Sequence, residues 1–363
     1  MPRINKKIFS WIAAALFGIL CLNAYAEEST VQDKIDDSPF GVLEFLHWND
    51  PWNNYKYPED GALGKAVALM KEAGVSWVRV DFLWQDIEPE EGKFDFTKYD
   101  VIVDLLTLNG INVLGILDYS ADWASSCGKW NCPPKENKLL INYAVKVIER
   151  YKDRIKHWEL WNEPDSGVYW KEQDGLKAYC QLLKEFYPAA KAADPECKVL
   201  NGGLAIANSS VNKLYDNGAG GYFDILNIHI FVTPLNEGAV KTVLAYPRLA
   251  YKIMKRNGDG HKKIWVTEIG CPGVQIKPPT VSNWWLGKNP TERQQADWVK
   301  EMLPQLIKAE AVEKVFWAFF RDCNQHWQNG TDYLGLIRWD FSRKPSFKAY
   351  KQCVEKWRKE REE

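Results

Sequence analysis

Short apolar runs alternate with longer amphipathic segments along most of the chain, and this alternation predicts strands followed by helices. The apolar runs are rich in Val, Ile, Leu and Trp, and the expected strands are 40–45, 77–82, 112–117, 157–161, 198–201, 225–229, 264–267 and 315–319. The segments between them carry apolar residues at helical spacing, and the expected helices include 62–73, 138–151, 176–193, 240–256, 292–308 and 347–358. Strands that are apolar throughout are typical of a parallel sheet covered on both faces.

Eight strand–helix units in this length indicate an α/β protein with a single (β/α)8 barrel. A doubly wound open sheet is the alternative, but its usual Gly-x-Gly-x-x-Gly turn after the first strand is missing. The sequence His47-Trp48-Asn49-Asp50-Pro51-Trp52 stands there instead. We therefore expect one domain over 39–363, preceded by a loose, polar and acidic arm at 27–38.

The N-terminal residues have the pattern of a secretory signal peptide. Three basic residues within positions 1–8 precede an apolar run at 9–22, and Ala24-Tyr25-Ala26 supplies the small-x-small cleavage pattern. A membrane anchor is the alternative, but the apolar run is short for a spanning helix. We expect residues 1–26 to be removed and the protein to be secreted or periplasmic.

Charge and composition are ordinary for a globular protein, with 26% charged and 46% hydrophobic residues. The 47 basic and 48 acidic side chains give no electrostatic reason to expect a nucleic acid as partner. Without the three basic leader residues, 44 basic and 48 acidic side chains remain, a net charge of −4 that is unsuited to an anionic membrane surface. We expect no membrane partner, and a monomer or weak oligomer.

Seven cysteines follow the leader, at 127, 132, 180, 197, 271, 323 and 353. An oxidising compartment permits disulfides, and Cys127 and Cys132 flank a short Gly/Trp loop, so they are the first choice for a pair. Cys271 and Cys323 would pair only if their loops are neighbours. The odd number leaves at least one thiol free or paired between molecules. No Cys-x-x-Cys or clustered Cys/His spacing indicates zinc.

Two glutamates stand where strands end, and in such a barrel the reacting groups lie at the carboxyl ends of the strands. Glu163 follows the fourth strand and Glu268 the seventh. Facing carboxyl groups, one protonated and one ionised, are what glycosidic bond cleavage needs. Taken alone, Asn162-Glu163-Pro164 also fits a helix start, with Asn as cap and Pro in the first turn, and Glu268 fits a salt bridge at the rim.

These two motifs together resemble clan A retaining glycoside hydrolases. The resemblance rests on Trp161-Asn162-Glu163-Pro164 and Thr267-Glu268-Ile269-Gly270. It runs over residues 39–352, and flanking segments narrow it to family 39 and related family 5-like members: 74–82, 84–89, 92–96, 333–336 and 344–350.

The resemblance implies a role for five residues. Glu163 would be the general acid/base and Glu268 the nucleophile, while Asn162 would bind the 2-hydroxyl of the attacked sugar. Arg79 would lie beside Glu268 and favour its ionised form, although an ordinary buried ion pair is the alternative. His229 would lie near the acid/base or the nucleophile, unless it is a structural histidine.

One position departs from the family pattern. Many clan members carry an aromatic hydroxyl two residues after that histidine, which donates to the nucleophile, whereas this chain has Phe231. Tyr119, Tyr222 or another group would have to supply the contact, or the nucleophile lacks it.

The chain has 18 Trp, and indoles can stack on the apolar face of a sugar ring. Trp317 matches the clan's aromatic platform under the reacting sugar. Further tryptophans follow strands on the expected active-site face, and about half of them are expected to be packing plugs: Trp48, Trp52, Trp84, Trp123, Trp130, Trp170, Trp284, Trp285 and Trp327. Polar partners for sugar hydroxyls would be Asp118, Asn49 and Asn324, whereas Trp77, Trp158, Trp298 and Trp357 are expected in the core.

The sequence thus predicts a retaining glycoside hydrolase that cleaves β-linked oligo- or polysaccharides by double displacement, with no metal or organic cofactor. Endo action is favoured because the aromatic residues spread over many loops. An exo-acting β-xylosidase-like enzyme and a non-catalytic glycan-binding barrel are the alternatives.

Overall fold

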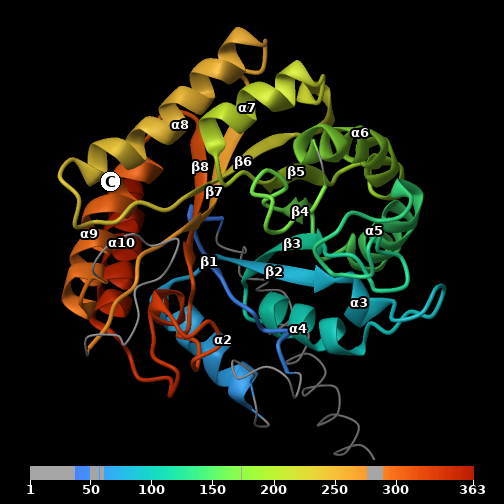
Figure 1. Ribbon diagram of the computed structural model, residues 1–363. Coiled ribbons are helices and arrows are strands. Elements are labelled where there is room, and N and C mark those ends of the chain that lie inside the picture. The colour runs from blue at the N-terminus through green and yellow to red at the C-terminus, as the bar shows by residue number, and fades with distance from the viewer. Residues whose placement is uncertain (1–36, 50–56, 58–60, 173, 276–288) are drawn as a thin grey trace, which may run out of the picture. The chain divides into compact units, whose positions relative to one another are not determined.

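The computed structural model describes residues 37–49, 57, 61–172, 174–275 and 289–363 (Figure 1). The expected signal peptide and almost all of the expected arm lie outside these residues. The compact unit that is described begins at Asp37.

Eight parallel strands form a closed barrel in sequence order, and β1 closes it by pairing with β8. The strands are β1 (Phe40–Leu43), β2 (Trp77–Leu83), β3 (Asn112–Asp118), β4 (His157–Asn162), β5 (Lys198–Gly203), β6 (Ile225–Ile230), β7 (Lys263–Ile269) and β8 (Val312–Ala318). All eight expected strands are present, which confirms the (β/α)8 barrel.

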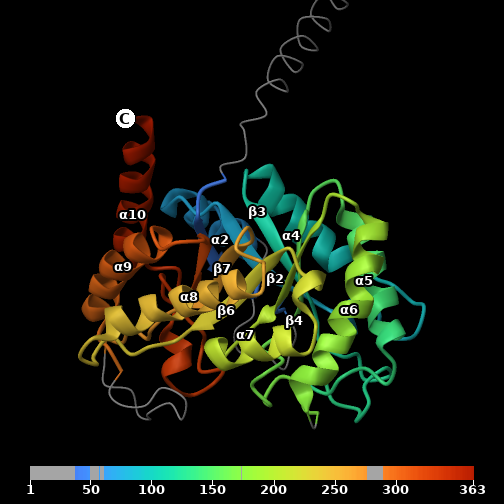
Figure 2. The same cartoon turned by 90° about the horizontal axis from the view of Figure 1, so that it is seen from above.

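Helices follow the strands and surround the barrel (Figures 1 and 2). The main ones are α2 (Ala62–Ala73), α4 (Thr97–Leu108), α5 (Asn137–Tyr151), α6 (Gly175–Ala193), α7 (Ala207–Asp216), α8 (Ala239–Arg256), α9 (Glu292–Ile307) and α10 (Pro345–Glu362), with the four-residue α3 (Trp84–Ile87) after β2. None of the described helices is long and apolar enough to cross a membrane.

Besides the four-residue α3, two longer helices, α4 and α7, were not among those expected from the pattern. The middle of α4 reads Val-Ile-Val, which is as typical of a strand as of a helix. Helix α7 begins Ala-Asn-Ser-Ser, and Asn and Ser favour turns over helix interiors. In both cases, burial of an apolar side of the helix against the barrel outweighs the weak local preference.

The barrel interior changes from apolar to polar along the strands. A cluster of large side chains fills one part, and ring contacts cross the barrel from Trp77 on β2 to Trp265 on β7, with centroids 5.0 Å apart. Polar side chains of the same strands are also buried, among them Arg79, Glu159, Asn201, Asn227 and Thr267. Because buried polar groups are costly without partners, this layer has to form a bonded network.

A disulfide joins Cys127 and Cys132 in the segment between β3 and α5, with the Cα atoms 6.0 Å apart. This confirms the first pairing expected. The other described cysteines are free and buried, and they include Cys271 and Cys323, so the conditional pairing of those two is not realised.

Candidate active site

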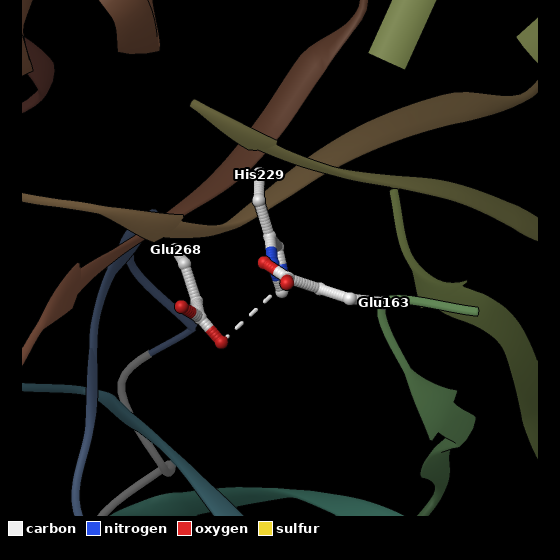
Figure 3. Close-up of side chains that lie close together, drawn as sticks. All are labelled: Glu163, His229 and Glu268. Carbon is white, nitrogen blue, oxygen red and sulfur yellow. Dashed lines mark hydrogen bonds and ion pairs between the residues drawn. The ribbon is translucent and has the colours of Figure 1, made fainter. Parts of the chain in front are cut away.

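Glu163 and Glu268 face one another at the carboxyl ends of β4 and β7 (Figure 3). One oxygen of each carboxyl group and one ring nitrogen of His229 all lie within 4.8 Å of one another. The two carboxyl side chains are 15% and 13% exposed, so both are largely shielded yet reach solvent. The barrel thus brings Glu163 and Glu268, which are 105 residues apart in the sequence, into one site.

The backbone at the end of β4 bends sharply to aim Glu163. Trp161 has φ 67° and Glu163 has φ 43°, in the left-handed region that residues with a Cβ seldom adopt. Such strain is retained where surrounding structure enforces it, often at functional sites. The alternative of a helix start at Asn162-Glu163-Pro164 is wrong, since the next helix, α6, begins only at Gly175.

Arg79 on β2 bonds two carboxylates, those of Glu159 on β4 and Glu268 on β7. Its Nη1 donates to Glu268 at 2.6 Å, as expected beside the nucleophile candidate. Its Nε and Nη2 also donate to the two oxygens of Glu159, at 2.7 and 2.8 Å. This bidentate pair fixes the plane of the guanidinium and so fixes the direction of its third bond, to Glu268.

Glu159 was not predicted as a site residue, although it stands within the expected strand 157–161. It is fully buried, and Gly203 N donates to it at 2.9 Å. A charged residue in the middle of an apolar strand was the available signal, because a buried carboxylate needs a partner.

Opposing influences act on Glu268. Burial raises the pKa of its carboxyl group, His229 lowers it when protonated, Arg79 lowers it, and Glu163 raises it when ionised. Arg79 therefore favours the ionised form as expected, but the net pKa of Glu268 is above its ordinary value because desolvation is the larger effect.

The hydrogen-bond chain around His229 assigns the proton on Glu163. The Thr267 hydroxyl donates to Asn227 Oδ1 at 2.6 Å, so at 3.0 Å it can only accept from His229 Nε2. Neutral His229 then carries its proton on Nε2, and its Nδ1 must accept from Glu163 Oε1, 2.8 Å away. Glu163 is consequently protonated in this arrangement.

The pKa shifts agree with that assignment. Burial lowers the pKa of His229, which favours the neutral ring. Burial, followed by the nearby negative charge of Asp165, raises the pKa of Glu163 to about 8. One carboxyl group is thus an acid at neutral pH, while the other is held by a guanidinium.

Gly203 at the end of β5 makes room for the His229 ring. A Cβ at Gly203 would lie 1.9 Å from His229 Nε2. Because that distance is far below any real contact, only glycine allows the imidazole to sit between β5 and β7.

Asn162 is held at both ends of its amide. Its Oδ1 accepts from Arg79 Nη2 at 3.0 Å, and its Nδ2 donates to the Tyr119 hydroxyl at 3.0 Å. Asn162 thus precedes Glu163 and shares Arg79 with Glu268, and its expected contact to a sugar 2-hydroxyl stays a prediction.

The two tyrosines considered in place of a hydroxyl at Phe231 have different positions. Tyr222 belongs to a short 3-10 helix before β6, at the opposite end of the strand from His229, so that suggestion is wrong. Tyr119 bonds Asn162. Tyr169, which was not predicted, is close enough to Glu163 and Glu268 for both charges to raise its pKa.

Two expected sugar contacts are contradicted by burial. Asp118 has no exposed surface, and it lies beside Asp81. Burial raises the pKa of Asp118, and the negative charge of Asp81 raises it further. Asp118 therefore lies beneath the candidate site and is not at its surface. Trp317 is also fully buried, and its indole donates to Leu334 O at 2.9 Å, so it offers no open face to a sugar in this structure.

The loop tryptophans divide into plugs and partly open rings. Trp84 and Trp170 are buried plugs, and the expected core positions Trp77, Trp158 and Trp298 are buried. Trp48 is partly exposed and stacks on Phe45 at 4.1 Å, and Trp123 is partly exposed with its indole bonded to Glu88 O. The expected binding residue Trp285 lies outside the described residues.

The cluster of Glu163, His229 and Glu268 has the ligand types of a metal site. The hydrogen bond between Glu163 and His229 and the ion pair between Arg79 and Glu268 favour acid/base chemistry over metal binding. Glu163 carries a proton toward His229, and the Arg79 cation bound to Glu268 would repel a metal ion at the same carboxylate.

Comparison with known proteins agrees with this site. The family described as "Glycosyl hydrolase catalytic core" matches residues 135–340, and a family described as "Beta-galactosidase" matches residues 53–116. The first match includes both glutamates and His229 and spans more than half of the chain.

Curated relatives are distant. The chain is 28% identical over 127 residues to endo-1,4-β-xylanase A of Phanerodontia chrysosporium, covering 32% of this chain and 29% of that protein. It is 24% identical over 198 residues to β-glucosidase 25 of Oryza sativa subsp. japonica, covering 52% and 38%. The matched part thus spans less than two fifths of these relatives.

Solved structures share the fold. A family 39 glycoside hydrolase from Bacteroides cellulosilyticus WH2 superposes with a TM-score of 0.70 and 23% identity, over 87% of this chain and 63% of the other. Xylanase 10B from Thermotoga maritima superposes with a TM-score of 0.60 and 17% identity, over 88% of this chain and 96% of the other. With the paired carboxyl groups and the family match, these findings lead to one conclusion: the chain belongs to the glycosyl hydrolase catalytic core family.

Proposed function

We propose that this protein hydrolyses β-glycosidic bonds with net retention of configuration, with Glu268 as nucleophile and Glu163 as general acid/base. The observation that carries the proposal is the asymmetry of the pair. Glu163 holds a proton against neutral His229, while Glu268 is bound to the Arg79 cation, and their oxygens lie within 4.8 Å.

Each residue has one task in the two steps. Glu268 attacks the anomeric carbon while the Glu163 proton moves to the departing oxygen, which leaves a glycosyl ester on Glu268. Glu163, now ionised, takes a proton from water, the water oxygen attacks the same carbon, and the bond to Glu268 breaks. Neutral His229 positions protonated Glu163 for the first step through Nδ1.

The close approach of the carboxyl groups favours retention over inversion. Retaining enzymes hold them about 5–5.5 Å apart, whereas inverting enzymes leave roughly 6.5–9.5 Å for a water molecule. One oxygen of each carboxyl group lies within 4.8 Å of the other, which supports the shorter, retaining separation.

We further propose that the substrate is a β-linked poly- or oligosaccharide cut within the chain, after export to an oxidising compartment. The names of the relatives, an endo-1,4-β-xylanase and a β-glucosidase, make xylan and β-glucan the first substrates to test. The leader pattern and the Cys127–Cys132 disulfide support export. Partly open aromatic rings such as Trp48 and Trp123 support contacts to more than one sugar.

The test is a comparison of wild type with Glu268→Ala on β-linked tetrasaccharides and aryl glycosides. Glu268→Ala should lose activity by at least about 10⁴-fold, because the covalent step needs the carboxylate. With a β-aryl glycoside as substrate, azide should restore some turnover by displacing the aryl group, and the product should be a glycosyl azide of inverted, α configuration, identified by NMR. The matched control is Glu237→Ala, an exposed glutamate after β6. Unchanged turnover in Glu268→Ala would remove the assignment, and glycan binding without cleavage by wild type would favour a non-catalytic barrel.

A further inference from the structure

The disulfide-closed loop after β3 carries an unusually open ring. Trp130 lies between Cys127 and Cys132 and is 47% exposed, the most of any aromatic residue in the described part of the chain. An indole normally gains free energy by burial, so an ordered open ring is a candidate contact surface.

Several bonds hold this loop in place. Besides the disulfide, Ser120 N donates to Trp130 O at 3.0 Å. The next residue, Asn131, donates through Nδ2 to Val168 O at 2.8 Å and accepts from Lys171 N at 2.9 Å. The Trp130 loop is therefore fastened to the end of β3 and to the loop that follows Glu163.

Ring contacts lead from Trp130 to the catalytic residues. Its ring meets Tyr119 edge-on with centroids 4.8 Å apart, and Tyr169 lies 6.0 Å away. The Tyr119 hydroxyl accepts from Asn162, the neighbour of Glu163. Trp130 thus extends the site outward on the side of β3 and β4.

A second aromatic group lies elsewhere on the rim. Phe45 and Trp48 follow β1, and Trp327 follows β8, with Trp48 and Trp327 centroids 5.8 Å apart. In the closed barrel, β2 separates this group from β3 on one side, and β5, β6 and β7 separate it from β4 on the other. The catalytic pair accordingly has aromatic surfaces in two directions.

We propose that Trp130, with Tyr119 and Tyr169, binds a second sugar ring of the substrate, next to the ring attacked by Glu268, and that the Cys127–Cys132 disulfide holds this subsite in position. The proposal rests on the proposed function. Sugar rings present an apolar CH face that stacks on an indole, and a ring fixed in advance loses little entropy on binding.

The first test compares a β-linked tetrasaccharide with a β-glycosyl fluoride of the same sugar, which has one ring only. Trp130→Ala should lower kcat/KM for the tetrasaccharide at least about tenfold more than for the fluoride, since truncation of a central contact commonly costs more than 1 kcal/mol. Trp130→Phe should recover part of this difference because it keeps a ring. Leu108→Ala, at a position 85% exposed at the end of α4, is the control and should show no difference between the substrates. Equal losses on both substrates, or none, would overturn the proposal.

The second test measures binding without turnover. In Glu268→Gln, a bound tetrasaccharide should protect Trp130 from oxidation by N-bromosuccinimide, as located by peptide mass spectrometry. If wild type cleaves no glycoside but protection is seen, the hydrolase proposal falls and the subsite stands. Cleavage without protection has the opposite meaning, and absence of both overturns both.

The disulfide has its own variant. Cys127→Ser/Cys132→Ser should reproduce the tetrasaccharide-selective loss of Trp130→Ala. Full tetrasaccharide activity in the double variant would overturn the role assigned to the disulfide.

Discussion

Different hydrogen-bond partners distinguish Glu163 from Glu268. The Thr267 hydroxyl is committed to Asn227, so His229 presents a bare Nδ1 to Glu163, and that nitrogen needs a protonated partner. Burial acts on both groups in the same sense by disfavouring charge, which lowers the pKa of His229 and raises that of Glu163. Burial therefore favours a neutral histidine beside a neutral acid.

The pH dependence should report this proton. Because burial raises the pKa of Glu163 to about 8, kcat/KM should fall about tenfold per pH unit above pH 8, where the acid is lost. The measurement is the pH profile on an oligosaccharide. Glu163→Gln should be inactive on the oligosaccharide but should still cleave a 2,4-dinitrophenyl glycoside, because that leaving group needs no proton. The activity of Glu163→Gln on this glycoside should not decline at alkaline pH. The same decline in Glu163→Gln would show that another group causes it.

At the level of strands, close backbone packing places the site. The end of β4 bends through positive φ at Trp161 and Glu163, and the end of β5 passes His229 without a side chain at Gly203. β6 and β7 pair with His229 directly opposite Glu268, after a register shift at Ile228/His229. Four consecutive strand ends thus position Glu163, His229 and Glu268 in one site.

Gly203→Ala should disturb this packing selectively. The added Cβ would lie 1.9 Å from His229 Nε2, so the ring must move and Glu163 loses its partner. We expect kcat to fall on the order of 10²-fold, since displacements of about 1 Å have that effect, and the alkaline limb of the pH profile to shift.

Gly64→Ala is the matched control for that substitution. Gly64 lies in α2 with nothing within 4 Å of its added Cβ, so activity should be unchanged and stability should rise by about 0.5–1 kcal/mol. A Gly203→Ala enzyme with normal kcat and an unshifted pH profile would contradict the role given to the glycine.

For the whole barrel, buried ionisable groups couple folding to pH. His157 at the start of β4 lies between the rings of Trp77 and Trp265, at 5.0 and 4.9 Å. Burial, then the positive charges of Lys314 and Lys198, lowers its pKa to about 4, against the weaker opposing effects of Asp37 and Asp224. Between pH 4 and 6.5 the unfolded chain thus binds more protons at this position than the folded one, so this contribution to stability is lost as pH falls.

The expected result is a difference between variants. Between pH 7 and pH 5, the melting temperature of His157→Asn should fall less than that of wild type, because the group that takes up a proton on unfolding is gone. Carboxyl groups with raised pKa, such as Asp322, act in the opposite sense in both proteins and cancel in the comparison. His261→Asn, at an exposed position, should follow wild type. Identical acid sensitivity of His157→Asn and wild type would refute this prediction.

Local pattern was sufficient for most of the framework. Apolar runs of strand length and amphipathic segments of helix length are properties of neighbouring residues, so all eight strands and six of the helices follow from them. Both glutamates stand directly at strand ends, and Cys127 and Cys132 are five positions apart, so their proximity also needed no knowledge of the fold.

Contacts between distant residues decided the rest. Arg79 holds Glu159 and Glu268, 80 and 189 positions away, and the proton on Glu163 depends on a chain through His229, Thr267 and Asn227. Whether a strand-end residue is open or sealed likewise depends on what packs over it, which is why Asp118 and Trp317 are buried while Trp130 is exposed. Residue type determines what chemistry is possible, but burial and hydrogen-bond partners come from packing across the closed barrel, and these set protonation and access.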